Sequence, residues 1–302
     1  MPNRPVILLV LLLAVAAPAR AWDDVGHEVV AYIAWEHMTP EAREAVVELM
    51  RRASWGSGLP QLLPQTGAAG ARARTLFMRA STWPDLVRSR DEPARQARYH
   101  RSNWHYINYF WEEHAGAPRD RDDLRPAGTN AVERLERLAA LVRDETLPRA
   151  QRGIYAAWIL HLVGDLHQPL HTSARVTAAE PEGDRGGNLF GLGGSATLHG
   201  YWDGILRRSV ERRSREGDAA YVARIARAIV AAHPPSGEGR PDAYAEWALE
   251  GFETAKRDVY RADLERGRTP PESYRRHAYE VAAPAVARAG YRLAALLNHL
   301  FA

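Results

Sequence analysis

The sequence predicts an all-α protein with one mainly helical domain. Three observations lead to this prediction: apolar residues recur at helical spacing along most of the chain, strand patterns are sparse, and no repeat or change of composition marks a second domain. The 302 residues include no cysteine, so the fold must be stabilised by packing or bound metal and not by disulfides.

The first 21 residues have the layout of an export signal. Arg4 is followed by an apolar run over residues 6–17, and residues 19–21 form a small-x-small cleavage site. We therefore expect a signal peptide that is cleaved between Ala21 and Trp22. The mature protein is expected to be secreted or periplasmic.

The mature domain, residues 22–302, has nearly balanced charge. Without Arg4 and Arg20, 38 basic residues face 37 acidic ones, so a broad basic face for nucleic acid is not indicated. No second apolar run approaches the roughly 18 residues that span a bilayer. We expect a soluble monomer without stable membrane association.

Helical signals follow one another along the mature chain. Asp24–His37 forms the first helix, and Thr39-Pro40-Glu41 provides the N-cap, first-turn proline and early acid of a second, which ends at Arg52. A loop rich in Gly, Pro and Gln follows. Further helices are expected over residues 71–81, 130–143, 150–167, 219–232, 241–266 and 271–300. Between them, residues 172–200 form a long glycine-rich segment that could hold a small hairpin.

The strongest chemical signal lies at the end of the helix expected over residues 150–167. His161 and Asp165 are four residues apart, so both side chains lie on one helix face and can share a cation. Taken alone, the pair is better explained as a buried histidine bonded to an aspartate. Pro169 disturbs the helix and lets His171 point elsewhere. His167 lies about 120° from His161 around the helix and is expected in a second layer or in the core.

Other potential ligands lie beside tryptophans and glycines. His199 and Asp203 repeat the four-residue spacing, Asp85 follows Trp-Pro, and His105 follows a tryptophan that could exclude water. The full set of candidate ligand side chains is His27, Asp85, His105, His161, Asp165, His171, His199 and Asp203. Nitrogen and carboxylate donors without thiolate suit zinc, although the set would also tolerate manganese or iron.

Trp22 becomes a further ligand if it is the first residue of the mature protein. Its free α-amine has a pKa about two to three units below that of lysine, so a metal can displace its proton near neutral pH. His27 stands five residues further on. From the terminus alone, an ordinary surface aromatic is the simpler interpretation.

In order and spacing, these residues resemble the zinc-dependent, single-strand-specific nucleases of the S1/P1 family, exported phosphodiesterases whose fold is related to bacterial zinc phospholipase C. The resemblance covers nearly the whole mature chain. It is carried by Trp22-Asp-Asp-Val-Gly-His27, Trp83-Pro-Asp85, Trp104-His-Tyr-Ile107, the segment from His161 to His171, Gly186-Gly-Asn188, and the segment from His199 to Asp203.

The resemblance implies a recessed site for three zinc ions. The first would be held by Asp85, His105, His161 and Asp165, the second by His171, His199 and Asp203, and the third by the Trp22 amine and carbonyl with His27 and Asp165. Asp165 would therefore bridge two ions.

The resemblance also implies hydrolysis of single-stranded DNA and RNA to 5'-phosphate products by a zinc-bound water, together with 3'-nucleotidase activity. Asn188, Tyr106 and Asn108 are candidate substrate contacts, and family members often have aspartate where this chain has Asn108. An unpaired base could stack on Tyr106 or on one of the aromatics at 109–111. Core packing is expected for at least half of these four rings.

Two alternatives remain at this point. A zinc phospholipase C would usually end its ligand set with a glutamate four residues after the histidine, where this chain has Asp203. An exported zinc-stabilised binding protein would have closed coordination shells with no position for water.

Overall fold

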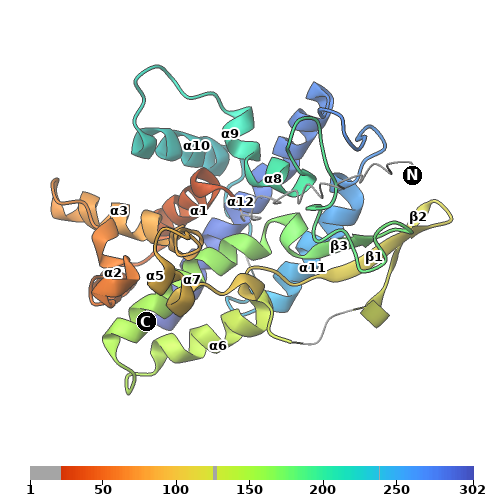
Figure 1. Ribbon diagram of the computed structural model, residues 1–302. Coiled ribbons are helices and arrows are strands. Elements are labelled where there is room, and N and C mark those ends of the chain that lie inside the picture. Colours follow the sequence, from red (N-terminus) through yellow and green to blue (C-terminus); the bar gives the residue numbers. More distant parts are fainter. Residues whose placement is uncertain (1–21, 125–127, 238) are drawn as a thin grey trace, which may run out of the picture.

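The computed structural model describes residues 22–124, 128–237 and 239–302. This part of the chain is mainly helical, which confirms the predicted fold class, and a small three-stranded sheet lies at one side (Figure 1). The predicted signal peptide and its cleavage site fall on residues 1–21 and so lie outside the described residues.

Twelve α-helices occur in the described ranges. They are α1 Asp24–His37, α2 Pro40–Arg51, α3 Ala69–Ala80, α4 Trp83–Leu86, α5 Pro93–Tyr99, α6 Ala131–Arg143, α7 Arg149–Leu166, α8 Leu198–Asp203, α9 Ile205–Ser209, α10 Asp218–Ala232, α11 Tyr244–Thr254 and α12 Glu272–Leu300. Short 3-10 turns are Trp55–Ser57, Pro60–Leu62, Ser102–Trp104, Asp122–Leu124 and Pro169–His171. None of these helices is long and apolar enough to cross a bilayer.

The long helices agree with the sequence periodicity to within two residues at each end, with one exception. The helix expected over residues 241–266 ends at Thr254, and a π-helical turn, Ala255–Val259, follows it. After Val259 the chain is no longer helical in this range, and two tertiary hydrogen bonds fix its course. The Tyr274 hydroxyl donates to the Val259 carbonyl at 2.7 Å, and the Tyr260 hydroxyl donates to Asp184 Oδ2 at 2.6 Å.

The first two helices begin with side-chain caps. Asp23 Oδ1 accepts from the Gly26 amide at 3.0 Å, and Thr39 Oγ1 accepts from the Ala42 amide at 3.2 Å. Each cap satisfies an amide that has no partner within the helix. The cap on α1 determines where the helix carrying His27 begins.

Helix α7 crosses the core and packs against α2, α4, α6 and α12. Its residues from 156 to 166 are all buried. Two glycines permit the close helix contacts around it. A Cβ on Gly153 would lie 2.2 Å from the Leu49 carbonyl oxygen of α2, and a Cβ on Gly290 of α12 would lie 2.5 Å from the Ile33 side chain of α1. In this packing the polar side chains of His27 on α1 and of His161 and Asp165 on α7 are buried.

The sheet has the strand order β2-β1-β3, where β1 is Tyr109–His114, β2 is Ala117–Asp120 and β3 is Ser173–Val176. β1 and β2 form an antiparallel hairpin around Ala115 and Gly116, which both have positive φ. β3 pairs in parallel with β1. The small hairpin considered for residues 172–200 is reduced to one isolated antiparallel bridge between Gly191 and Thr197, and the same segment contributes β3.

Candidate metal centre

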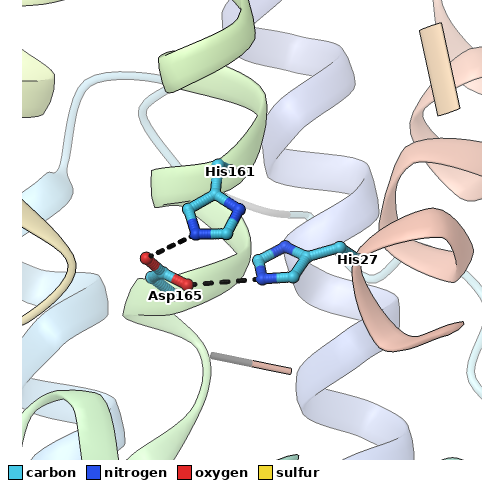
Figure 2. Close-up of side chains that lie close together, drawn as sticks. All are labelled: His27, His161 and Asp165. Carbon is cyan, nitrogen blue, oxygen red and sulfur yellow. Dashed lines mark ion pairs between the residues drawn. The ribbon is translucent and has the colours of Figure 1, made fainter. Parts of the chain in front are cut away.

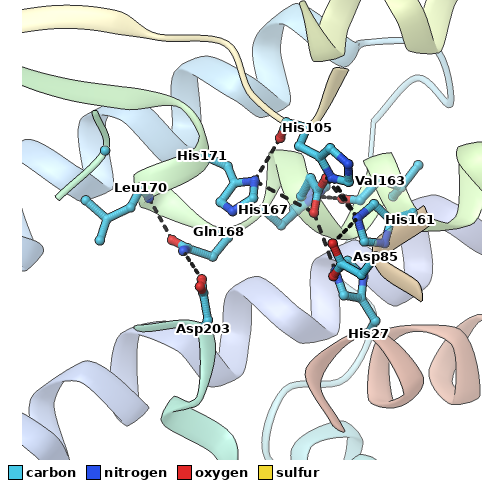
Figure 3. A network of polar contacts seen from close by, with 12 residues as sticks. His27, Asp85, His105, His161, Val163, His167, Gln168, Leu170, His171 and Asp203 are labelled. Atoms are coloured by element: carbon cyan, nitrogen blue, oxygen red, sulfur yellow. Dashed lines mark hydrogen bonds and ion pairs between the residues drawn. The ribbon is translucent and has the colours of Figure 1, made fainter. Parts of the chain in front are cut away.

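Asp165 lies at the centre of a buried cluster of histidines. Its Oδ2 is 3.1 Å from His105 Nδ1 and 3.3 Å from His161 Nε2. Its Oδ1 is 3.5 Å from His27 Nε2 and 3.7 Å from His171 Nδ1. One carboxylate thus contacts four imidazoles. Figure 3 shows these four histidines close together.

The helical spacing of His161 and Asp165 places both on one buried face of α7, as expected. His161 Nδ1 donates to the Ser81 carbonyl at 2.7 Å, so in the neutral ring Nε2 carries the lone pair. This Nε2 lies 2.9 Å from His105 Nδ1 and 3.9 Å from Asp85 Oδ1. His161, His105 and Asp85 thus form the first of three groups of potential metal ligands. Burial lowers the pKa of His161 to about 3, so the ring is neutral and able to ligate at neutral pH.

A second group consists of His171, His199 and Asp203. His171 Nδ1 bonds to the His105 carbonyl, and His199 Nδ1 bonds to the Gly186 carbonyl, each at 2.7 Å. The two Nε2 atoms face each other at 3.1 Å, and His199 Nε2 is 3.6 Å from Asp203 Oδ2. Burial, followed by the nearby His199, lowers the pKa of His171. Two imidazoles whose Nε2 atoms face each other beside a carboxylate form a site for a cation.

A third group joins His27 of α1 to His161 and Asp165 of α7, as Figure 2 shows. The His27 and His161 rings stack with centroids 4.0 Å apart. This approach depends on Gly164, because a Cβ there would lie 2.8 Å from His27 Nδ1. Trp22 is fully buried, and its side chain packs on Gly26, where a Cβ would lie 2.6 Å from Trp22 Cβ. Trp22 therefore precedes α1 by two residues, and its side chain packs on the first turn of this helix, which supplies His27.

These three groups have the donor atoms and the electrostatics of metal sites. Within each group the ligand atoms lie within 4.8 Å of one another. Both ring nitrogens of His27, together with Oδ1 of Asp85 and of Asp165, are buried with no hydrogen-bond partner in the described structure. Burial, and then the charge of Asp85, raises the pKa of Asp165 well above its usual range. Bound cations would satisfy these atoms and stabilise the carboxylates.

Some groups that hold the cluster together were not predicted. Gln168 Nε2 donates to Asp203 Oδ1 at 2.7 Å, and its Oε1 accepts from the Leu170 amide at 2.7 Å. Arg88, one turn after Asp85, places Nη2 3.2 Å from Asp85 Oδ1. The only sequence signal for either residue is its position beside a candidate ligand. Arg88 is a largely buried cation at the edge of the cluster.

His167 is a core residue, as expected from its helical angle. Its Nδ1 bonds to the Val163 carbonyl at 2.7 Å, and its Nε2 accepts from Arg292 Nη1 at 2.9 Å. Burial and the positive charge of Arg292 lower its pKa to about 3. Both ring nitrogens are thus engaged away from the three metal-site groups.

The candidate substrate contacts are only partly gathered at the cluster. The half-buried Tyr106 has its ring centroid 5.8 Å from that of His171. Asn188 is half-buried, and its side-chain amide donates to the Arg185 carbonyl at 2.8 Å. Asn108 is half-buried just before β1. The aromatics Tyr109, Phe110 and Trp111 are buried in β1, so they are packing residues and not base-stacking surfaces.

Comparison with known proteins finds a matching family model and several relatives. The family model described as S1/P1 Nuclease matches residues 22–302. Nuclease P1 of Penicillium citrinum is 24% identical over 187 residues, which cover 60% of this chain and 57% of that protein. Endonuclease 2 of Arabidopsis thaliana is 25% identical over an alignment of 317 residues that covers 98% of this chain and 96% of that protein. The match therefore spans little more than half of the first relative and nearly all of the second.

Proposed function

The chain belongs to the S1/P1 nuclease family, and on this basis we propose that it hydrolyses phosphodiester bonds in single-stranded DNA and RNA. The products carry 5'-phosphates, and 3'-mononucleotides are substrates as well. The observation that carries the proposal is the fusion of three potential metal groups into one buried cluster around Asp165. A phosphodiester has several oxygens, and adjacent metal sites can engage the attacking and the leaving oxygen together.

Three zinc ions are the proposed cofactors. Asp85, His105, His161 and Asp165 hold the first, His171, His199 and Asp203 the second, and the amine and carbonyl of Trp22 with His27 and Asp165 the third. The absence of thiolates and the neutral, buried imidazoles support zinc at these positions. When bound, the zinc ions activate water and neutralise charge on the phosphate.

The chain's own side chains then have distinct roles. Asp165 links two sites, because its two oxygens point to different histidines. The Ser81 carbonyl fixes the tautomer of His161, and Gln168 orients the carboxylate of Asp203. Arg88 adds a positive charge beside Asp85 that attracts the substrate phosphate.

Preference for single strands follows from the depth of the cluster. Most of the proposed ligand side chains are buried, while Asp85 keeps 12% of its side-chain surface exposed. A phosphate in a stiff duplex cannot enter such a site, whereas a flexible strand can. Tyr106 beside His171 offers a ring on which the substrate base stacks, and Asn108 and Asn188 are polar groups for base and phosphate.

Export is part of the proposal because the third site needs a free amine on Trp22. Cleavage between Ala21 and Trp22 would create that amine in a secreted or periplasmic mature protein, residues 22–302, which we propose to be monomeric. N-terminal sequencing of protein recovered from outside the cytoplasm tests this step. If the mature chain started at another residue, the proposed third site would lack the Trp22 amine and the proposal for that site would be wrong.

The activity is tested by comparing release of acid-soluble nucleotides from denatured DNA and RNA with hydrolysis of phosphatidylcholine. We expect nucleotides from both nucleic acids, slower release from duplex DNA, and no hydrolysis of the lipid. Hydrolysis of phosphatidylcholine alone would replace the nuclease proposal with a phospholipase. No hydrolysis of any substrate by the zinc-loaded protein would refute an enzymatic function.

A further inference from the structure

We propose that a cavity between α5 and α7 is a second nucleotide subsite, which holds a nucleotide of the strand beyond the bond that is hydrolysed. This inference rests on the proposed nuclease function. The cavity has a volume of about 460 Å³, within the range of about 300 to 1,000 Å³ common for small-molecule sites. We call this cavity the α5–α7 pocket. Its aromatic and cationic lining residues are Arg98, Tyr99, Arg101, Trp104, Tyr155 and Trp158.

The charge of the α5–α7 pocket fits a polyanion. Arg98 and Arg101 line it, and no aspartate or glutamate of the described chain does. Three other cavities differ in this respect, since each is lined by three acids. These are Glu250, Asp258 and Glu280 in one cavity, Asp24, Glu28 and Asp218 in another, and Glu246, Glu250 and Glu253 in a third. Arginines without carboxylates attract phosphate.

The aromatic rings of the α5–α7 pocket pack against other rings and a guanidinium group. The ring centroid of Trp104 lies 4.8 Å from that of Trp158, and the Arg134 guanidinium lies 4.8 Å over Trp104. The Tyr99 ring contacts Trp83 at 5.6 Å. Trp104, Tyr99 and Tyr155 are only half-buried. Fixed, partly exposed rings beside guanidinium groups suit stacking of unpaired bases, because every base has a π-face.

The α5–α7 pocket shares a wall with the metal-site groups. The Trp158 ring lies 5.2 Å from the His105 ring and 6.3 Å from the His161 ring by centroids. Tyr155 precedes Asp165 by ten residues on α7, which corresponds to roughly 15 Å along the helix. A strand with one phosphate at the cluster can therefore extend into the pocket, while a very short substrate cannot fill both.

An exposed tryptophan adjoins this region. Trp55 is 71% exposed and directly follows Ser54, which also lines the cavity. An exposed indole ring has a large face on which an unpaired base can stack. Trp55 thus offers a further ring to a strand leaving the pocket.

The test compares two substrates with zinc-loaded protein: a dinucleoside monophosphate and a single-stranded decanucleotide. Tyr155→Leu removes a ring, and Arg98→Ala removes a charge. We expect Tyr155→Leu to raise KM for the decanucleotide about five- to tenfold, with kcat unchanged. For the dinucleoside monophosphate, kcat/KM should stay within about twofold, because that substrate does not reach the pocket.

Salt dependence gives a readout that loss of structure would not mimic. Each phosphate contact on a single strand contributes about 0.7 to the slope of log affinity against log salt. Arg98→Ala should lower the slope for the decanucleotide by about that amount, while Arg98→Lys should keep it. Tyr155→Phe should retain the parent KM because it keeps the ring. Arg276→Ala, an exposed arginine of α12 outside the pocket, is the matched control and should change nothing.

The outcomes separate the two proposals. Unchanged KM and salt slope in both pocket variants would overturn the subsite, as would an equal rise in KM on both substrates. Failure of the parent protein to hydrolyse either substrate would overturn the nuclease function itself, and the subsite with it. A selective loss on the decanucleotide supports both.

Discussion

The Nε2 atoms of His171 and His199 face each other at 3.1 Å, while both Nδ1 atoms are bonded to backbone carbonyls. Neither ring can donate to the other without gaining a proton, and burial opposes protonation of His171. The carboxylate of Asp203 lies beside them. The fold thus places two opposed Nε2 atoms beside a carboxylate, an arrangement that a bound cation would stabilise.

Metal removal should therefore affect stability as well as activity. We expect the purified mature protein to contain close to three zinc ions, and a chelator to lower both Tm and turnover markedly, because metal binding free energy adds to folding free energy. Elemental analysis and thermal denaturation measure the two effects. One zinc ion in the fully active protein would rule out the three-ion site, and identical melting curves would show that these histidines are ordinary core residues.

Asp165→Asn should reduce zinc content and kcat together, because the amide loses a charge at the point where four imidazoles converge. A loss of kcat of about a hundredfold or more is expected. His167→Ala is the control near the same helix end, since His167 bonds to Val163 and Arg292 outside the cluster. The Tm of this variant should be lower than that of the parent, because a buried side chain is lost. Its zinc content and kcat should remain within a few-fold of the parent. Equal zinc loss in both variants would mean that the ligands on α7 are misassigned.

Gln168→Leu should weaken the second zinc site selectively. The glutamine amide bonds to Asp203 Oδ1, and residues that orient a ligand typically contribute about 10- to 100-fold to metal affinity. Competition with a graded series of chelators measures the affinity of each ion. Gln61→Leu removes a bond to the Trp55 carbonyl outside the cluster and is the matched control. Simultaneous loss of all three ions in Gln168→Leu, with unchanged melting, would contradict the role assigned to Gln168.

Acid should remove the contribution of metal to stability. Burial lowers the folded pKa of His161 from 6.5 to about 3, and the pKa values of His27, His105 and His171 shift in the same direction for the same reason. Between about pH 6.5 and 3 the unfolded chain binds protons that the folded one does not. Stability from these groups is therefore complete above about pH 6.5 and falls as pH decreases.

The ligands compete with protons over the same range, so zinc is lost there too. The difference in Tm between zinc-loaded and chelator-treated protein should be largest above about pH 6.5 and shrink steadily towards pH 4. Melting curves at a series of pH values measure it. A difference that stays constant down to pH 4 would show that these histidines do not hold the metal.

Local patterns were sufficient for most of the fold and for the ligands on α7. Helical spacing placed His161 and Asp165 on one face and His167 on another, and Thr39 capped α2 as its sequence context predicted. These features depend on a few neighbouring residues, so a single sequence contains the necessary information. The convergence of His27 and His105 on Asp165 depends on long-range packing. It could be expected only through resemblance to a family.

The remaining features depend on contacts that no local pattern encodes. Gln168 meets Asp203, 35 residues away, and the Ser81 carbonyl meets His161, 80 residues away. The β1–β2 hairpin turns at Ala115 and Gly116 with φ of 52° and 81°, without the Asn-Gly or Asp-Gly pair that normally marks such a turn. The sequence therefore left both base stacking and core packing open for its aromatics, and the parallel pairing with β3 buries all three in the sheet.

The N-terminus provides the sharpest test of the proposed third site. Trp22 is buried against Gly26, the Asp23 amide donates to the Asp203 carbonyl at 2.9 Å, and Asp23 Oδ1 caps α1. These contacts use the side chain of Trp22 and the groups of Asp23, and none of them uses the Trp22 amine. A protein produced without the signal, with an initiator methionine before Trp22, should therefore keep the fold and the first two sites.

In that methionine-extended protein the Trp22 nitrogen is an amide, which does not bind zinc usefully at neutral pH. We expect about two zinc ions and a kcat lower by about two orders of magnitude or more. The Tm of the extended protein should be closer to that of the parent than to that of the metal-free protein. Removing the methionine with an aminopeptidase, so that the chain starts at Trp22, should restore the third ion and the rate. Equal zinc content and rate in the extended and trimmed proteins would exclude the terminal ligand, while the sites at His161 and His199 would still stand, because their ligands are side chains that the extension does not alter.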